Sequence, residues 1–290
     1  MTPRSIDEVL AAAGVMAGID TAEAKLIRDG TNAIYELADV VARIGRVGGE
    51  RGARTSVTAA RWLAASDVPV VRPLTTVEQP MLVDGRPVTW WRRLPQHRHA
   101  TPAELGAILR ELHALPQPAS AWVPELDPLE GIEARICAAH VSRDDHRWLH
   151  EHAAELLAQY TDLPSGLPPR VIHGDAWQGN VVVPDGGGPT LLDLDHVSFG
   201  PPEWDLVPLA VDHTDFARIS MEDYQGFVNA YGHDVTRWAG YDTLAAIREL
   251  RWTAFALSKA GTGGAAAREA EHRIACLRGR IPRPWTWSAF

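Results

Sequence analysis

The chain has 290 residues, of which 46% are hydrophobic and 22% charged, a composition typical of a globular protein rather than a disordered or fibrous one. Its net charge is −9. Residues 1–95 hold 12 basic and 11 acidic residues, whereas residues 96–290 hold 16 and 26, so the excess acid lies in the second part. This balance excludes nucleic acid as a partner, because a polyanion requires a basic face. The acid is either a solvated helical surface or a cleft that attracts cations.

Two further features bear on location. The only cysteines, Cys137 and Cys276, form neither a disulfide framework nor a metal-binding pattern, which indicates a reducing cytoplasm. No apolar run approaches the roughly twenty residues of a membrane span, so we expect no membrane association. Asp7 and Glu8 precede the apolar stretch 9–19, where an export signal would be basic. We therefore expect a capped amphipathic helix there.

The first part of the chain predicts a sheet with one or two helices. Turn residues at Gly30-Thr31-Asn32 and Asp84-Gly85 separate short β-branched runs, which favours antiparallel strands. We expect an N-terminal domain over residues 1–94. The expected helices are 5–17 and about 53–65, and the expected strands are 25–28, 33–37, 40–44, 68–70, 81–83 and 87–92.

Helical patterns dominate after Leu94-Pro95. The stretch Thr101-Pro102-Ala103-Glu104 is a strong helix start, with an N-cap, proline at the first position and glutamate at the third. We expect a second domain over residues 95–290 and an α+β fold with a small sheet lobe, a larger helical lobe and a cleft between them. The expected helices are 102–114, 128–140, 142–160, 221–231, 241–260 and 264–279, with one more starting near Asp205.

The most informative segment interrupts these helices. It contains His173-Gly174-Asp175 followed by Asn180, and then Leu192-Asp193-Leu194-Asp195. The β-branched runs 181–183 and 190–192 flank the turn 184–189, which predicts a hairpin. That hairpin places Asn180 and Asp193 at one end, beside the loop that carries Asp175. Mg²⁺ favours such a site because it binds few protein oxygens and keeps room for water and phosphate.

The pattern His-Gly-Asp-x4-Asn, then Leu-Asp-x-Asp, then Gly200 to Leu206 resembles the aminoglycoside phosphotransferase and choline kinase family. The resemblance covers about residues 25 to 260. It implies a protein-kinase-like bilobal fold and transfer of the γ-phosphoryl group of ATP or GTP to a small-molecule hydroxyl. Under it, Asp175 is the catalytic residue that accepts the hydroxyl proton, and Asn180 and Asp193 hold Mg²⁺. We expect His173 to hold the loop backbone and the matching Asp205 to brace the catalytic loop.

The resemblance also assigns a nucleotide side. Gly30-Thr31-Asn32 falls where a phosphate-covering turn lies, and Trp91 stands in the last strand before the hinge. Arg43 occupies the place of the basic residue that pairs the nucleotide phosphates, where the family has lysine. No lysine is available there, since the only lysines are Lys25 and Lys259.

The following helix should offer a glutamate to orient this basic group. The sequence has Ser56 and Thr58 near that place, and Glu50 only before the expected helix. These departures leave open a nucleotide-binding regulatory protein without turnover as the rival hypothesis.

The acceptor is less defined by the sequence. The acidic second part favours an amine-bearing sugar or aminoglycoside, with a neutral sugar, a nucleoside or a choline-like acceptor as alternatives. Asp195 is either a substrate or supporting residue, or a surface charge of the hairpin. The other candidate substrate residues are Asp212, Asp215 and Trp204, although core packing explains a tryptophan equally well. We expect a monomer or homodimer.

Three histidines on the helix 142–160 are the remaining candidates. His146 and His150 lie one turn apart, with His152 close by. Surface helix histidines explain them better than zinc, because the sequence shows no acidic or thiolate partners in a ligand pattern.

Overall fold

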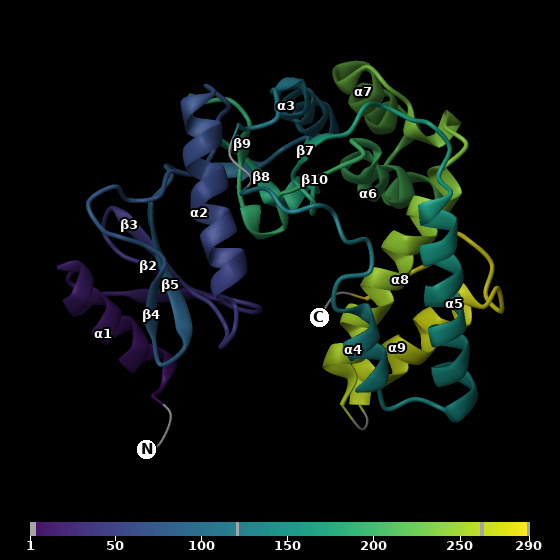
Figure 1. Cartoon of the computed structure of the whole chain (residues 1–290), viewed down its shortest axis with the longest axis horizontal. Helices are drawn as coiled ribbons and strands as arrows, with labels where there is room; N and C mark the ends of the chain where they lie inside the picture. Colours follow the sequence, from purple (N-terminus) through teal and green to yellow (C-terminus); the bar gives the residue numbers. More distant parts are fainter. Residues whose placement is uncertain (1–3, 120–121, 262–263, 289–290) are drawn as a thin grey trace. The chain divides into compact units, whose positions relative to one another are not determined.

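The computed structural model describes residues 4–119, 122–261 and 264–288. The chain divides into two compact units, each made of two separate segments (Figure 1). Unit 1 comprises Met1–Pro124 and Arg170–Phe199, and unit 2 comprises Glu125–Pro169 and Gly200–Phe290. The change from sheet to helix at Leu94-Pro95 therefore lies inside unit 1. The hairpin with the candidate metal ligands lies in unit 1 as well.

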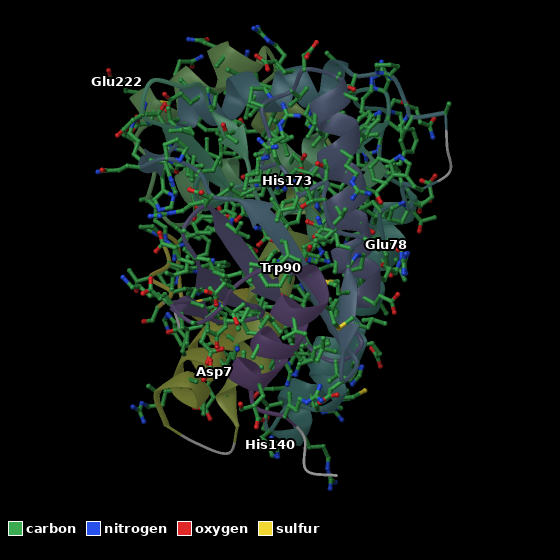
Figure 2. All side chains as sticks on the ribbon, turned by 90° about the vertical axis from the view of Figure 1, so that its left-hand side faces the viewer. Asp7, Glu78, Trp90, His140, His173 and Glu222 are labelled. Carbon is green, nitrogen blue, oxygen red and sulfur yellow. The ribbon has the colours of Figure 1, made fainter. Side chains whose placement is uncertain are left out.

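A five-stranded antiparallel sheet forms the N-terminal part of unit 1. Its strands follow the order β1-β2-β3-β5-β4. Their bounds are Lys25–Asp29 (β1), Ala33–Glu36 (β2), Val40–Ile44 (β3), Met81–Val83 (β4) and Arg86–Arg92 (β5). The helix α1 (Ile6–Ala17) packs on this sheet, and Val9, Ile44 and Trp90 are among the buried core residues (Figures 1 and 2).

Local signals set the ends of these elements. Ser5 and Glu8 form a capping box that starts α1, as expected from the sequence. The β4–β5 hairpin turns at Asp84 and Gly85, whose φ angles are 50° and 74°. Two successive residues with positive φ match the right-handed twist of the flanking strands, which explains the short turn.

The rest of unit 1 carries the candidate site. Helix α2 (Glu50–Ala65) lies in the chain between β3 and β4, and α3 (Pro102–Ala114) lies between the N-terminal sheet and the hairpin region. The hairpin strands β8 (Val181–Pro184) and β9 (Thr190–Leu191) form a small sheet with β6 (His97–His99), and β7 (Arg170–Ile172) pairs with β10 (Ser198–Gly200). Two 3-10 turns complete the region, η1 (Gln178–Asn180) and η2 (Leu194–His196).

Unit 2 is helical in its described residues. The long helix α8 (Tyr241–Ala260) is its centre, and α4, α5, α6 and α9 pack against it. None of the helices in the described part of the chain has the length and hydropathy that a transmembrane span requires. The other elements are α4 (Ile132–Cys137), α5 (Arg143–Thr161), α6 (Glu203–Thr214), α7 (Met221–Tyr231), η3 (Val235–Arg237) and α9 (Gly264–Leu277).

The α+β class is confirmed, and several element bounds are corrected. Residues 68–70 form no strand, because only Val70 makes an isolated bridge, with Leu191. The helix expected at 128–140 covers only 132–137, since Gly131 precedes it with a φ of 72°. The helix expected at 53–65 begins three residues earlier, at Glu50. Strands β6 and β10 were missed, and the exposed residues of β6 have no apolar alternation to reveal it.

Candidate active site

A tight turn after β7 carries the first part of the site. The buried Val171 and Ile172 lead into it, and Gly174 follows with a φ of 81°. A Cβ on Gly174 would lie 2.0 Å from the carbonyl oxygen of His196. Both the positive φ and this close approach require glycine, so the turn brings the loop against η2.

His173 ties this loop to the hairpin. Its Nε2 lies 2.7 Å from the carbonyl oxygen of Leu192, and its Nδ1 accepts a hydrogen bond from the backbone N–H of Asp175 at 3.4 Å. Because the Leu192 carbonyl is an acceptor and the Asp175 N–H is a donor, this pairing places the ring hydrogen on Nε2 and leaves Nδ1 as the acceptor. The ring is fully buried. His173 therefore positions the backbone on both sides of the site.

Asp175 and Asn180 contact each other across the loop. The Asn180 amide nitrogen donates to the Asp175 backbone carbonyl at 2.9 Å and to its Oδ2 at 3.2 Å. These bonds occupy the amide nitrogen, so Oδ1 is the side-chain atom of Asn180 that can bind a cation.

The hairpin brings Asp193 to the same end. Val181 pairs with Leu191, and the Leu192 N–H donates to the Asn180 carbonyl at 2.9 Å. Asp193 then adopts a left-handed conformation with a φ of 51° and a ψ of 63°. Such a conformation in a non-glycine residue costs about 1 kcal/mol or more and concentrates at functional sites.

The donor set fits Mg²⁺. Asn180 offers a neutral amide oxygen and Asp193 a carboxylate, both hard oxygen ligands. The Asp193 side chain is 41% exposed, which leaves space for water and phosphate oxygens. Two protein ligands of this kind suit Mg²⁺, which keeps most of its remaining coordination for solvent and substrate.

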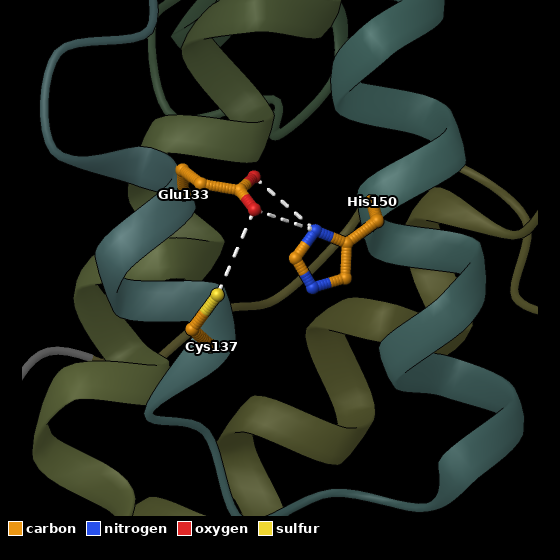
Figure 3. Close-up of side chains that lie close together, drawn as sticks. All are labelled: Glu133, Cys137 and His150. Atoms are coloured by element: carbon orange, nitrogen blue, oxygen red, sulfur yellow. Dashed lines mark hydrogen bonds and ion pairs between the residues drawn. The ribbon is translucent and has the colours of Figure 1, made fainter.

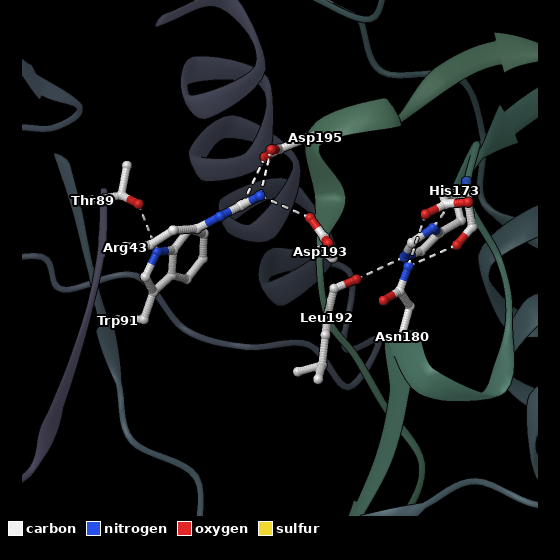
Figure 4. A network of polar contacts seen from close by, with 9 residues as sticks. Arg43, Thr89, Trp91, His173, Asn180, Leu192, Asp193 and Asp195 are labelled. Atoms are coloured by element: carbon white, nitrogen blue, oxygen red, sulfur yellow. Dashed lines mark hydrogen bonds and ion pairs between the residues drawn. The ribbon is translucent and has the colours of Figure 1, made fainter. Parts of the chain in front are cut away.

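Arg43, on β3, contacts both acidic residues of the Asp-x-Asp motif (Figure 4). Its guanidinium binds Asp195 through two hydrogen bonds, of 2.7 and 2.5 Å, and binds Asp193 through one of 2.9 Å. Burial lowers the pKa of Arg43, but the attraction of Asp195 and Asp193 outweighs it, so the pKa lies above its ordinary value. A fixed positive charge therefore stands beside the candidate metal ligands.

Asp195 supplies the carboxylate that the sequence of α2 lacks. Glu50 lies in the first turn of α2 and pairs with Arg54, one turn later on the same helix. The helix instead offers Gly52, where an added Cβ would lie 3.6 Å from the Cβ of Asp195. The turn η2 packs against α2 at this position, and Asp195 reaches Arg43 from it. In sequence, the Arg43–Asp195 pair was signalled only by two departures from the family pattern. One is arginine in place of lysine at position 43, and the other is a small residue in place of the helix glutamate.

The predicted nucleotide residues surround Arg43. The Asn32 amide oxygen, turned toward the guanidinium, accepts from its Nε at 3.0 Å. Gly30 and Thr31 are exposed in the turn before it. A narrow recess lies beside these groups, and its volume of about 10 Å³ is room for about one water molecule and not for a nucleotide. It is lined by Asn32, Arg43, Gly45, Gly49, Ala53, Pro87, Thr89 and Asp195.

Trp91 is part of the core of unit 1 rather than an open binding surface. Its side chain is 6% exposed, and its indole N–H donates to the Thr89 hydroxyl at 2.8 Å.

The candidate residues of unit 2 already have partners within that unit. Asp205 is buried at the start of α6, and the Trp204 ring lies under the Arg251 guanidinium at 5.5 Å. Asp212 pairs with Arg218 at 2.9 Å, and burial raises the pKa of Asp212.

Asp215 pairs with Arg283 at 2.9 Å. Arg283 also binds Glu249 at 3.0 Å, so one arginine contacts two acidic side chains. Sequence reasoning missed this group because its members are far apart in the chain.

Comparison with known proteins identifies the family of the chain. The model of the phosphotransferase enzyme family (APH) matches residues 20–247. A search of curated proteins gave no match.

Solved structures share the fold over nearly the whole chain. An amicoumacin kinase in complex with AMP-PNP, Ca²⁺ and Ami has a TM-score of 0.73 at 13% identity, covering 96% of this chain and 95% of that one. A microcompartment-associated aminopropanol kinase has a TM-score of 0.70 at 19% identity, covering 93% and 95%. A choline/ethanolamine kinase family protein from Mesorhizobium loti has a TM-score of 0.65 at 17% identity, covering 95% and 96%.

These likenesses confirm the protein-kinase-like fold class that the sequence motifs implied. The family model covers well over half of the chain. The chain therefore belongs to the phosphotransferase enzyme family, a family of small-molecule kinases.

Proposed function

We propose that this protein transfers the γ-phosphoryl group of ATP or GTP to a hydroxyl group of a small molecule, in a reaction that requires Mg²⁺. The observation that carries the proposal is a single polar network in unit 1. On one side Asn180 donates to Asp175, and on the other Arg43 donates to both Asp193 and Asp195. A base, two hard oxygen ligands and a buried cation are the parts that direct phosphoryl transfer requires.

Asp175 is the base of this proposal. One of its carboxylate oxygens accepts from Asn180, so the carboxylate keeps a fixed orientation. The other oxygen is the one that accepts the proton of the acceptor hydroxyl as its oxygen bonds to the γ-phosphorus and the bond to the nucleoside diphosphate breaks. His173 and Asn180 act through Asp175 by holding the loop that carries it.

Asn180 and Asp193 are the residues that would hold Mg²⁺. When bound, the ion neutralises charge on the β- and γ-phosphates. Asp193 lies at the same end of the hairpin as Asn180 and has a left-handed backbone, which supports this assignment.

Arg43 binds the nucleotide phosphates in this proposal, and Asp195 positions it. A guanidinium held by a carboxylate through two bonds has one orientation, as lysine has when a helix glutamate holds it. The absence of that glutamate was the main argument for a regulatory protein without turnover. The Arg43–Asp195 pair supports turnover instead.

For the acceptor we propose an amine-bearing molecule such as an amino sugar or aminoglycoside. The support is the acid excess of residues 96–290. The support comes from the summed negative charge of this part of the chain. Individual carboxylates support it less, because Asp212 and Asp215 already pair with Arg218 and Arg283.

The test is nucleotide consumption with a panel of acceptors, measured with and without Mg²⁺ and with product identified by mass. The panel contains aminoglycosides, choline-like amines, amino alcohols and neutral sugars, each with ATP and GTP. Phosphorylation of any member that requires Mg²⁺ and is lost in Asp175→Asn supports the reaction. Transfer that survives this substitution would falsify the role of Asp175. A neutral sugar as the best acceptor, with no effect of salt on its KM, contradicts the proposed acceptor class.

A further inference from the structure

Two helices of unit 2 bring together three side chains that the sequence alone did not connect. Glu133 and Cys137 lie one turn apart on α4, and His150 faces them from α5 (Figure 3). One ligand atom from each residue lies within 4.8 Å of the other two. Glu133 and Cys137 are exposed and His150 is partly exposed, so solvent ions reach the cluster. The acidic and thiolate partners that the histidines of this helix lack in sequence are thus supplied by α4.

The distances suit a tetrahedral ion. The His150 Nδ1 lies 3.1 Å from Glu133 Oε1, and the Cys137 Sγ lies 3.6 Å from the same oxygen. Ligand bonds of about 2.3 Å to sulfur and about 2.0–2.1 Å to nitrogen and oxygen, at tetrahedral angles, separate donors by about 3.3–3.6 Å. These two separations are within a few tenths of an ångström of these values. The ligand atoms of Cys137 and His150 lie within 4.8 Å of each other, so side-chain rotation can bring the third pair into the same range.

The donor types select the class of metal. A thiolate and an imidazole are borderline-soft ligands that favour Zn²⁺ over Mg²⁺. Partial desolvation by neighbouring atoms and the nearby Glu133 raise the pKa of Cys137, so without a cation the thiol is favoured. A divalent cation reverses this balance, because a coordinating thiol loses its proton.

We propose that Glu133, Cys137 and His150 bind one Zn²⁺-type ion that joins α4 to α5, with water in the fourth position. The proposal is independent of the phosphotransferase function, because it uses residues of unit 2 that take no part in the Asp175 network. Its consequence is structural. The ion crosslinks α4, which has only six residues, to a helix of 19 residues.

Co²⁺ is the probe for this site, since thiolate coordination gives a charge-transfer band and a tetrahedral site gives intense d–d bands. We expect untagged, reduced protein to bind one Co²⁺ with both features, and Zn²⁺ to displace it. Cys137→Ser should remove the charge-transfer band. His150→Ala should weaken Co²⁺ binding at least about tenfold, since even losing an outer partner of a metal ligand costs 10–100-fold.

Two matched variants serve as controls. Cys276→Ser changes the other cysteine, which is buried on α9, and His152→Ala changes a histidine of α5 that stacks on Trp148 instead. Both should keep the Co²⁺ spectrum and affinity. A band that persists in Cys137→Ser, or that disappears in Cys276→Ser, overturns the proposal.

A second measurement needs no variant and so does not depend on its folding. Zn²⁺ should slow alkylation of Cys137 in the native wild-type chain, as read by mass spectrometry of the modified peptide. An unchanged alkylation rate at saturating Zn²⁺ overturns the site.

Discussion

Arg43 and Asp195 are 152 residues apart in the chain and form a two-bond ion pair, with distances of 2.7 and 2.5 Å. The pair is mostly shielded from solvent, with 13% of the Arg43 side chain and 22% of Asp195 exposed. It joins the N-terminal sheet to η2, the turn after the β8–β9 hairpin. Asp195 is therefore committed to the guanidinium, which makes it a positioning residue for the nucleotide in our proposal.

Asp195→Asn should lower kcat/KM for the nucleotide by about 10- to 150-fold. A hydrogen bond to a charged group contributes about 1.5–3 kcal/mol, and the amide replaces one of the two accepting oxygens with a donor that faces Arg43. The measurement is initial rate against nucleotide concentration at saturating acceptor.

Glu50→Gln is the matched control, because Glu50 lies on α2 and pairs only with Arg54 among the contacts observed for it. It should leave nucleotide kinetics unchanged. If Asp195→Asn raised KM for the acceptor alone, the role of Asp195 as the partner of Arg43 would be wrong.

Asp175→Asn should lower kcat by about 10²- to 10⁴-fold, the usual contribution of a general base. The KM for the nucleotide should stay near the wild-type value, since Asp175 bonds to Asn180, whereas the proposed phosphate-binding Arg43 bonds to Asp193 and Asp195. Single-turnover rates check the first expectation, and nucleotide binding to the variant checks the second. An equal loss in binding and in rate argues for a structural role instead.

Local rules explain why the centre of the site could be predicted. The β-branched runs around a glycine-rich turn encode a hairpin, and the hairpin alone places Asn180 and Asp193 at one end. The same holds for the capped helices and for the Asp84-Gly85 turn. These features depend on residues close in sequence.

The rest depends on contacts between distant segments. Nothing local connects Arg43 with Asp195, and the spacing of Cys137 and His150 matches no metal pattern because two helices contribute the ligands. Strand β6 is exposed and short, so its pairing with β8 leaves no periodic pattern. Tertiary packing decides each of these cases.

Asp193→Asn should raise the Mg²⁺ concentration needed for half-maximal activity by at least about tenfold. The variant keeps one oxygen ligand but loses the charge that favours a divalent cation. Activity measured over a Mg²⁺ series tests this. Asp185→Asn is the control, because Asp185 is exposed in the turn of the same hairpin. An unchanged Mg²⁺ requirement in Asp193→Asn contradicts the assignment of Asp193 as a ligand.

Gly174→Ala should abolish activity. It should also lower the free energy of unfolding by more than the backbone strain of a positive φ alone would. Its Cβ would lie 2.0 Å from the His196 carbonyl oxygen. Gly186→Ala separates the two effects, because Gly186 also has a positive φ, of 74°, but an added Cβ would have nothing within 4 Å. The control should cost only about 1–2 kcal/mol, the usual penalty for the left-handed region. Urea unfolding of both variants provides the comparison, and equal losses would show that the contact with His196 is unimportant.

The stability of unit 2 should depend on pH through Glu249. Burial, together with a hydrogen bond to Asp215 and repulsion from it, raises the pKa of Glu249 to about 8, although Arg283 opposes the shift. The ordinary value is 4.5, so between about pH 4.5 and 8 the unfolded chain has released a proton that the folded chain keeps. The free energy of unfolding must fall as pH rises through this window. Above it, Glu249 is ionised in both states, so its contribution no longer changes with pH.

Glu249→Gln removes this dependence, because glutamine keeps the hydrogen-bond donor toward Asp215 and cannot ionise. Relative to the wild type, the variant should gain stability between about pH 5 and about pH 9. Urea unfolding across this range gives the difference, with Glu271→Gln on α9 as the control because its side chain is exposed. A constant difference between Glu249→Gln and the wild type would show that Glu249 is already ionised in the folded chain, with Arg283 rather than a retained proton stabilising it.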